Sequence, residues 1–133
     1  MSAFICSPEH IGAIAHFLVK DSYYERRFGG LKKVVEALVD TNIESVEYRY
    51  SDIKGISVEE FIGMTRNELV REAIRPTKRR YSPIEVAKLA FSYQYQSCEH
   101  PGWKDSKAYE IVECVIGQAV REMPGYEAAP WAV

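Results

Sequence analysis

The most reactive side chains lie in one short segment, residues 93–103, which reads YQYQSCEHPGW. Its thiol, Cys98, stands two residues before the imidazole of His100. A thiol becomes a useful nucleophile when a nearby base or positive field favours the thiolate, so this pair is a candidate for nucleophilic catalysis. The segment offers no third group to orient the imidazole, and a cysteine on the inner face of a helix commonly acts as a small apolar residue. The favoured interpretation is a helix end followed by a turn, with Cys98 and His100 as the catalytic alternative.

Metal binding is a second chemistry for these residues. Cys6 and His10 together with Cys98 and His100 would make a Cys₂His₂ set, but the spacings match none of the tight ligand pairs of zinc sites. Cys6 also precedes the helix that would carry His10, so the two need not share a face. We expect no metal and no cofactor, with Cys6 buried and His10 capping or packing against the first helix.

Nucleic-acid binding is suggested by a local excess of positive charge. Between positions 71 and 80 the only acidic residue is Glu72, and the basic residues are Arg71, Arg75, Lys78, Arg79 and Arg80. Arginine pairs with phosphate, and the neighbouring aromatic Tyr81 could stack on a base. The whole chain nevertheless has a formal net charge of −2 and no recognition-helix motif. A nucleic-acid-binding module using Arg75, Lys78, Arg79 and Arg80 therefore remains an alternative.

Protein binding is suggested by the aromatic residues, because interfaces favour Tyr, Trp and Arg. The chain has nine tyrosines and two tryptophans, and Tyr93, Tyr95 and Trp103 fall within the reactive segment. The competing interpretation is that these rings build the core and satisfy their polar tips at its edge. We expect this for most of them, which leaves a minority for a binding surface.

The elements that must position these residues are helices. Helix starts are predicted from SP at 7–8, the capping box SVEE at 57–60 and the stronger SPIE at 82–85, because serine caps free amides and proline fits the first helical position. The last helix should begin near Asp105 or Ser106, and its apolar stripe is the cleanest in the chain. Apolar spacing also predicts helices after residue 10 and after residue 30.

The predicted helices are separated by turn signals. Residues 21–30 are polar, end in two glycines and are expected to form a loop. Asn42 is expected to break the helix that begins near Leu31, and residues 43–50 fit either a strand or a helix, with a helix favoured. Further stops are Pro76, Pro101-Gly102 and Pro124-Gly125. Residues 124–131 should then lie across the bundle, with Trp131 filling a groove.

The length and composition of the chain limit the possible fold class and the number of domains. The chain has 133 residues, 47% of them apolar and 27% charged, which is typical of one globular domain over residues 1–133. Three cysteines form no disulfide framework, no apolar run approaches the roughly 20 residues of a membrane span, and the N-terminus lacks signal-peptide features. We expect an all-α, compact single-domain bundle or orthogonal array of five to six helices, cytoplasmic and without a membrane partner.

Residues 82–131 also carry a resemblance. SPxEV at 82–86, YxYQSCEHPGW at 93–103 and PGYEAAPW at 124–131 resemble the signature of a family of small uncharacterised bacterial proteins found on phages, plasmids and other mobile elements. No reaction or ligand is assigned to that family, so the resemblance implies no catalytic residues. It implies a small accessory protein that acts on host or competitor machinery.

The leading hypothesis is therefore a non-enzymatic accessory protein that binds a protein or a nucleoprotein complex. Its candidate binding residues are Arg75, Lys78, Arg79, Arg80, Tyr81, Tyr93, Tyr95 and Trp103. The alternatives are the nucleic-acid-binding module and the small Cys/His-dependent enzyme, and the sequence leaves a homo-oligomer open.

Overall fold

The described chain is helical, as the sequence predicts. The structure is a computed structural model that describes residues 7–49, 66–76, 79–98 and 101–123. Within these residues it contains six α-helices and one 3-10 turn: α1 (Pro8–Val19), α2 (Ser22–Phe28), α3 (Leu31–Arg49), α5 (Arg66–Ile74), α6 (Pro83–Ser97), η2 (Trp103–Asp105) and α7 (Lys107–Glu122). None of the described helices is long and apolar enough to cross a membrane. The predicted capping box at 57–60 and the tail 124–131 lie outside the described residues.

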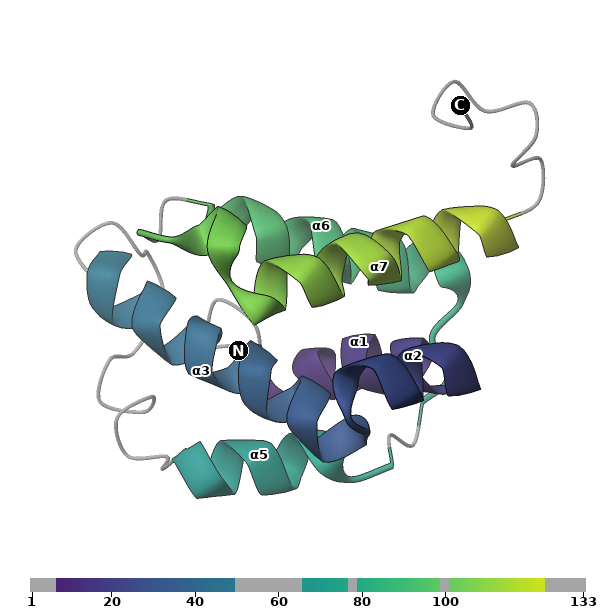
Figure 1. The fold of residues 1–133 in the computed structure, drawn as a ribbon, viewed down its shortest axis with the longest axis horizontal. Coiled ribbons are helices and arrows are strands. Elements are labelled where there is room, and N and C mark those ends of the chain that lie inside the picture. The colour runs from purple at the N-terminus through teal and green to yellow at the C-terminus, as the bar shows by residue number, and fades with distance from the viewer. Residues whose placement is uncertain (1–6, 50–65, 77–78, 99–100, 124–133) are drawn as a thin grey trace.

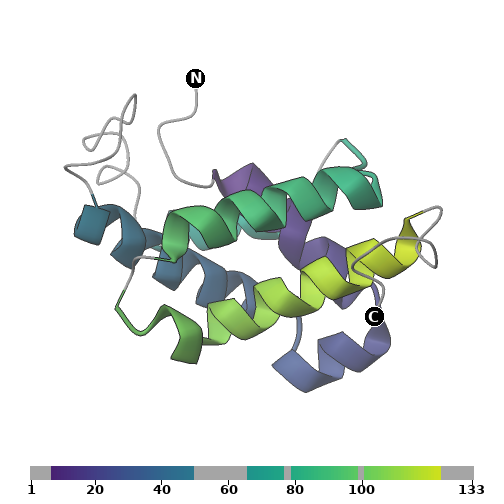
Figure 2. The ribbon, with the colours of Figure 1, turned by 90° about the horizontal axis from the view of Figure 1, so that it is seen from above.

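The helices form three layers (Figure 1). Helices α6 and α7 run antiparallel and make the most extensive contact of any pair. Helices α1 and α3 lie beneath them, and α5 packs on the far side of α1 and α3. Seen from above, α1 crosses obliquely under both α6 and α7 (Figure 2). This is the compact helical array that the apolar spacing predicts.

Serine caps begin three of the helices. Ser7 Oγ accepts the His10 N–H at the start of α1, at 3.3 Å. At α6 the capping box is complete: Ser82 Oγ accepts the Glu85 N–H, and Glu85 Oε1 accepts the Ser82 N–H at 3.1 Å. At α7 the Ser106 Oγ accepts the Tyr109 N–H at 3.1 Å. These local signals position the start of each element, and the predictions made from them are confirmed.

The polar segment 21–30 is a helix, so the predicted loop is wrong there. Asp21 Oδ1 accepts the Tyr23 N–H at 2.8 Å and caps α2. Gly29 ends the helix with a φ of 87°, a conformation that favours glycine. Because Phe28 is the only buried residue of α2, the helix shows no apolar stripe by which sequence could reveal it.

Asn42 does not break α3. The helix continues to Arg49, and Asn42 lies inside it with 1% of its surface exposed. Asparagine disfavours a helix by only about 0.7 kcal/mol relative to alanine, which burial of neighbours such as Leu38 and Val39 outweighs. The prediction of helix rather than strand after residue 43 is confirmed.

The core is shared by all three layers. Its largest fully buried side chains are Tyr93, Ile11, Ile14, Leu18, Leu38, Leu69, Ile111, Val34, Val35, Val39 and Val86. They come from α1, α3, α5, α6 and α7, so each layer is held through apolar contact with the next.

Helices α1 and α5 approach each other unusually closely. A Cβ atom on Gly12 would lie 2.5 Å from the backbone oxygen of Ala73, so no side chain fits there. One turn further along α1, His16 Nε2 donates to the backbone oxygen of Ile74 at 3.1 Å. This bond satisfies one of the carbonyls left unpaired at the C-terminal end of α5.

Candidate functional site

The segment from Tyr93 to Trp103 closes one end of the α6–α7 pair. The Tyr93 hydroxyl is buried and donates to the backbone oxygen of Leu38 in α3 at 2.6 Å. Trp103 is 4% exposed, and its ring lies 6.1 Å from the ring of Tyr93 and 5.5 Å, edge to face, from that of Tyr109. Gly102, with a φ of 78°, makes the turn that delivers Trp103. Tyr93 and Trp103, proposed from sequence as binding residues, are thus core residues, whereas Tyr95 is 76% exposed.

The Cys98 side chain is more exposed than the sequence suggests. It is exposed rather than on the inner face of α6, and its Sγ–H donates to the backbone oxygen of Tyr95 at 3.0 Å. His100 lies outside the described residues, as does Cys6, so neither the catalytic pair nor the four-residue metal set is assembled by the described chain. Among the described residues no cluster of metal-ligating side chains occurs.

The other described cysteine, Cys114, is half-buried in α7. Burial raises the pKa of its thiol, against the opposing charge of Arg27, whose Nη1 lies 3.6 Å from the sulfur. A raised thiol pKa leaves less of the nucleophilic thiolate at neutral pH. The thiol therefore fits a packing role against the Arg27–Glu110 ion pair, which joins α2 to α7 at 2.6 Å.

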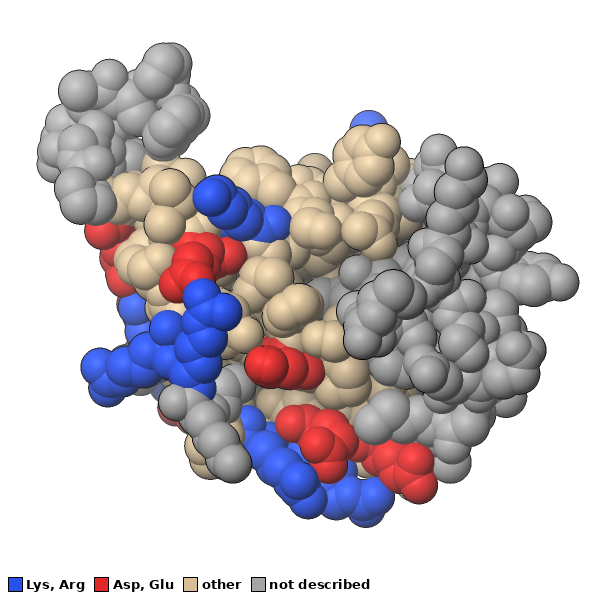
Figure 3. Space-filling view, turned by 180° about the vertical axis from the view of Figure 1, so that it is seen from behind, with Lys and Arg blue, Asp and Glu red and all other residues tan. Residues whose placement is uncertain are grey.

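The basic segment is partly neutralised by carboxylates. Arg75 pairs with Glu72 at 3.2 Å, and Arg79 pairs with Glu85 at the start of α6. On the face turned away from the viewer in Figure 1, Lys and Arg side chains lie next to Asp and Glu side chains (Figure 3). This mixed surface attracts phosphate less than an unbroken basic one would.

The remaining candidates of this segment are placed as follows. Tyr81 packs beneath the Arg79 guanidinium, 4.8 Å from the ring centre, and its hydroxyl donates to Glu9 Oε1 at 3.4 Å. Burial, and then the Glu9 charge, raise the pKa of Tyr81. Arg80 is exposed, and Lys78 lies outside the described residues. Tyr81 thus links the basic segment to α1, and one face of its ring is covered by Arg79 rather than open to a stacked base.

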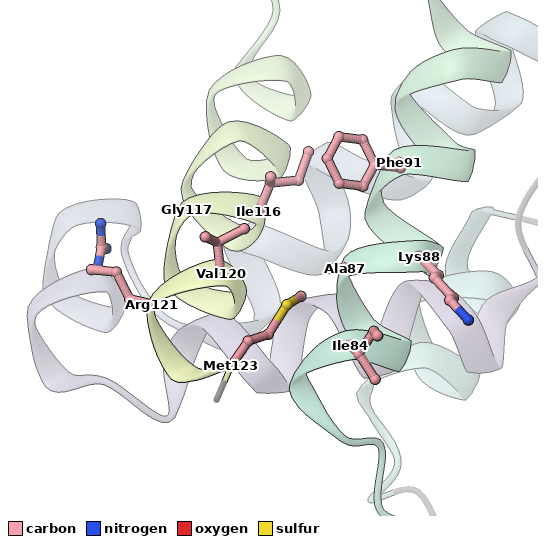
Figure 4. Close-up of a pocket in the computed structure, with 9 residues that line it drawn as sticks. All are labelled: Ile84, Ala87, Lys88, Phe91, Ile116, Gly117, Val120, Arg121 and Met123. Atoms are coloured by element: carbon pink, nitrogen blue, oxygen red, sulfur yellow. The ribbon is translucent and has the colours of Figure 1, made fainter. Parts of the chain in front are cut away.

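A groove lies at the other end of the α6–α7 pair (Figure 4), and its lining residues were not identified from the sequence. It has a volume of about 470 Å³. We call it the α6–α7 groove, and its lining residues are Ile84, Ala87, Lys88, Phe91, Ile116, Gly117, Val120, Arg121 and Met123. The size is within the range of known ligand pockets, about 300–1,000 Å³.

Helical spacing explains the α6 wall of this groove. Positions 84, 87, 88 and 91 follow the i, i+3, i+4, i+7 pattern of a single helix face. Ile84 and Phe91 are each 52% exposed, which is unusual for large apolar side chains in a protein with a well-filled core. On the α7 wall the Ile116 side chain points towards the Phe91 ring, and Gly117 lies beside Arg121 (Figure 4).

The ionisable groups of the groove stand at its edges. Lys88 and Arg121 extend away from the apolar centre on opposite sides (Figure 4). Arg121 Nη2 donates to the neutral oxygens of Tyr24 and Gln118, at 3.3 and 3.1 Å. The described lining contains no thiol, hydroxyl, imidazole or carboxylate side chain, so the arrangement suits the binding of an apolar group flanked by negative charge.

Comparisons with known proteins add no assignment. The chain matches no protein-family model, no curated protein and no solved structure.

Proposed function

We propose that this protein is a non-enzymatic accessory protein that binds an apolar segment of a partner protein in the α6–α7 groove. The observation that carries the proposal is the pair of half-exposed apolar side chains, Ile84 and Phe91, on one wall of a hollow of about 470 Å³. Covering such side chains is worth roughly 25 cal/mol per Å² of apolar surface removed from water. Exposed apolar patches with a polar rim mark interaction sites, protein-binding surfaces among them.

The charges on the rim of the groove indicate which kind of partner segment would bind there. Lys88 and Arg121 flank an apolar floor, so the preferred segment has a row of apolar side chains with acidic residues beside it. Binding an apolar segment between two helices is a common mode of peptide recognition. An accessory role of this kind also fits the resemblance to small proteins of phages and plasmids.

The two alternative functions have less support. Arg75 and Arg79 already pair with carboxylates, which weakens a nucleic-acid-binding module. The Cys98 thiol donates to a backbone oxygen at a helix end, and no hydrogen bond from it to a base is seen among the described residues. A nucleoprotein partner remains compatible with the proposal, because the exposed Arg80 lies four residues before Ile84 in the chain.

Site-specific crosslinking tests the proposal. A photo-crosslinking residue at position 88, on the rim, is expected to capture a defined partner in bacterial cells. The same residue at position 95, exposed on the same helix but outside the groove, is the matched control. An Ile84→Asp substitution should abolish the product formed from position 88, because a carboxylate would be placed in the apolar wall.

Two results would contradict the proposal. One is a product that forms equally well from positions 88 and 95. The other is a product from position 88 that survives Ile84→Asp while circular dichroism shows the fold intact.

A further inference from the structure

The chain leaves α7 at the wall of the α6–α7 groove. Met123 lines the groove and caps α7 in an extended conformation, with φ −78° and ψ 141°. The next residue is Pro124, and proline disfavours a helical conformation in the residue before it. The helix therefore ends at the groove, and residues 124–133 start from one end of it.

These ten residues are mostly apolar, as a segment that binds in an apolar groove should be. They read PGYEAAPWAV and contain two large aromatic residues, Tyr126 and Trp131, and a single charge, Glu127. The groove offers apolar walls and a cation on each edge, Lys88 and Arg121. Apolar surface and charge are thus complementary between the segment and the groove.

The segment is also long enough. Trp131 follows Met123 by 131 − 123 = 8 residues, and an extended chain spans at most about 3.3–3.6 Å per residue. The α7 wall runs from Ile116 to Met123, which at about 1.5 Å per residue is on the order of 10 Å. Gly125 supplies the conformational freedom for the chain to turn back. Trp131 can therefore reach any part of the groove.

We propose that residues 124–133 dock into the α6–α7 groove of their own chain in the free protein, with Trp131 against Phe91 and Val120. A covalent tether gives such a segment an effective concentration in the millimolar range, so even weak contacts keep the groove filled. The segment then competes with any partner for the same surface. The docking stands on its own, whereas the competition rests on the proposed function.

Tryptophan fluorescence of the full-length chain tests the docking. The chain has two tryptophans, and Trp103 is buried at the opposite end of the α6–α7 pair. Subtracting the spectrum of a Trp131→Phe variant from that of the wild type isolates the emission of Trp131. We expect this emission to be shifted to short wavelength and protected from quenching by acrylamide.

Groove substitutions locate the docking. Phe91→Ala and, separately, Ile84→Ala should shift the Trp131 emission to longer wavelength and remove its protection. Tyr95→Ala is the matched control, since Tyr95 is an exposed aromatic residue on the same helix that does not line the groove. It should leave Trp131 protected. Each variant is paired with its own Trp131→Phe reference, so that changes at Trp103 cancel.

Three results would overturn the docking. Trp131 could be accessible to acrylamide in the wild-type protein. Its protection could persist in both groove variants, which would place it elsewhere. Its protection could rise with protein concentration, which would assign the groove to the segment of a second copy.

The competition is tested through a Trp131→Ala variant carrying the crosslinking residue at position 88. Release of the segment should increase capture of the partner, and unchanged capture overturns the competition. If Trp131 is protected but position 88 captures nothing even in Trp131→Ala, the proposed function fails and the docking stands. If Trp131 is accessible and position 88 still captures a partner, the docking fails and the proposed function stands.

Discussion

The two ends of the α6–α7 pair are built from the same two helices but are finished differently. At the closed end, where α6 leads into α7, the turn after α6 delivers Trp103 between Tyr93 and Tyr109. At the open end, Ile84 and Phe91 face a hollow that no described residue fills. At the closed end of this pair, a tryptophan supplied by the chain that follows α6 fills the space between the two helices. Trp131 would do at the open end what Trp103 does at the closed end.

The ends also differ in how they are anchored. The closed end is tied to the layer beneath by a buried hydrogen bond, from the Tyr93 hydroxyl to Leu38. The polar contacts at the open end are exposed, and they include the Ser82–Glu85 capping box, the Arg79–Glu85 ion pair and the Lys20–Glu122 ion pair to α1 at 2.7 Å. Buried contacts determine stability more than exposed ones do, so the closed end should carry most of the stability of the pair and the open end most of its capacity to bind.

The strongest test of this difference is Trp103→Ala. Emptying the closed end should lower the free energy of unfolding by about 3–5 kcal/mol, because a large buried side chain is replaced by a cavity. Chemical denaturation followed by circular dichroism measures the loss. Tyr95→Ala, an exposed aromatic residue on α6, should change it by less than about 0.5 kcal/mol. Equal losses for the two variants would show that Trp103 does not close the pair.

A second comparison separates two buried hydroxyls one helical turn apart on α6. Tyr93→Phe should cost about 1 kcal/mol, because it removes a buried hydrogen bond. Ser97→Ala should be neutral or slightly stabilising, since Ser97 Oγ is buried without a partner among the described residues. Chemical denaturation checks both predictions: the midpoint of each variant is compared with that of the wild type, provided that the dependence of the unfolding free energy on denaturant concentration is unchanged. A greater loss from Ser97→Ala than from Tyr93→Phe would contradict the assignment of the anchor.

Phe91→Ala should be mild at the open end. Phe91 is half-exposed, so its removal should lower the free energy of unfolding by about 0.5–1 kcal/mol, well below the effect of Trp103→Ala. The same denaturation experiment measures it. A loss as large as that of Trp103→Ala would mean that the groove is part of the core rather than a binding surface.

The smallest effect is a pH dependence at the start of α6. The Ser82 backbone N–H, followed by the Arg79 charge, lowers the pKa of the Glu85 carboxyl. Because the folded pKa is below the unfolded value of about 4.3, the stabilisation is present above that pH and is lost as the pH falls through the folded pKa. Wild type should therefore exceed Glu85→Gln in stability at pH 7, and the difference should vanish in acid. A difference that persists below the folded pKa would exclude the carboxylate as its source.

Sequence predicts the helices well where their signals are local. The serine caps predicted at 7 and 82 depend on neighbours within three residues, and both are confirmed, as is the start of the last helix near Asp105 or Ser106. The helix α2 was missed because its polar surface hides the apolar period, and the break at Asn42 was wrong because burial in the assembled array outweighs a weak local preference.

The position and the lining residues of the groove could not be predicted from the sequence for a different reason. The spacing of Ile84 and Phe91 shows that they share a face of α6, but spacing alone does not say whether that face is covered by another helix. Coverage depends on how α7 packs against α6, which the spacing along α6 does not reveal. Similarly, the sequence favoured the core for most of the aromatic residues without saying which ones. The burial of Tyr93 depends on Leu38 in α3, which is 55 residues away in the chain.

The close approach of α1 and α5 has a consequence for cooperativity. Since backbone meets backbone at Gly12, a single methyl group would act as a wedge between two layers. In Gly12→Ala, amide hydrogen exchange should quicken across α5 while α6 and α7 keep their protection, because α5 contacts α1 and α3 rather than the α6–α7 pair. One residue without a side chain would then decide whether the lowest layer unfolds with the others or ahead of them.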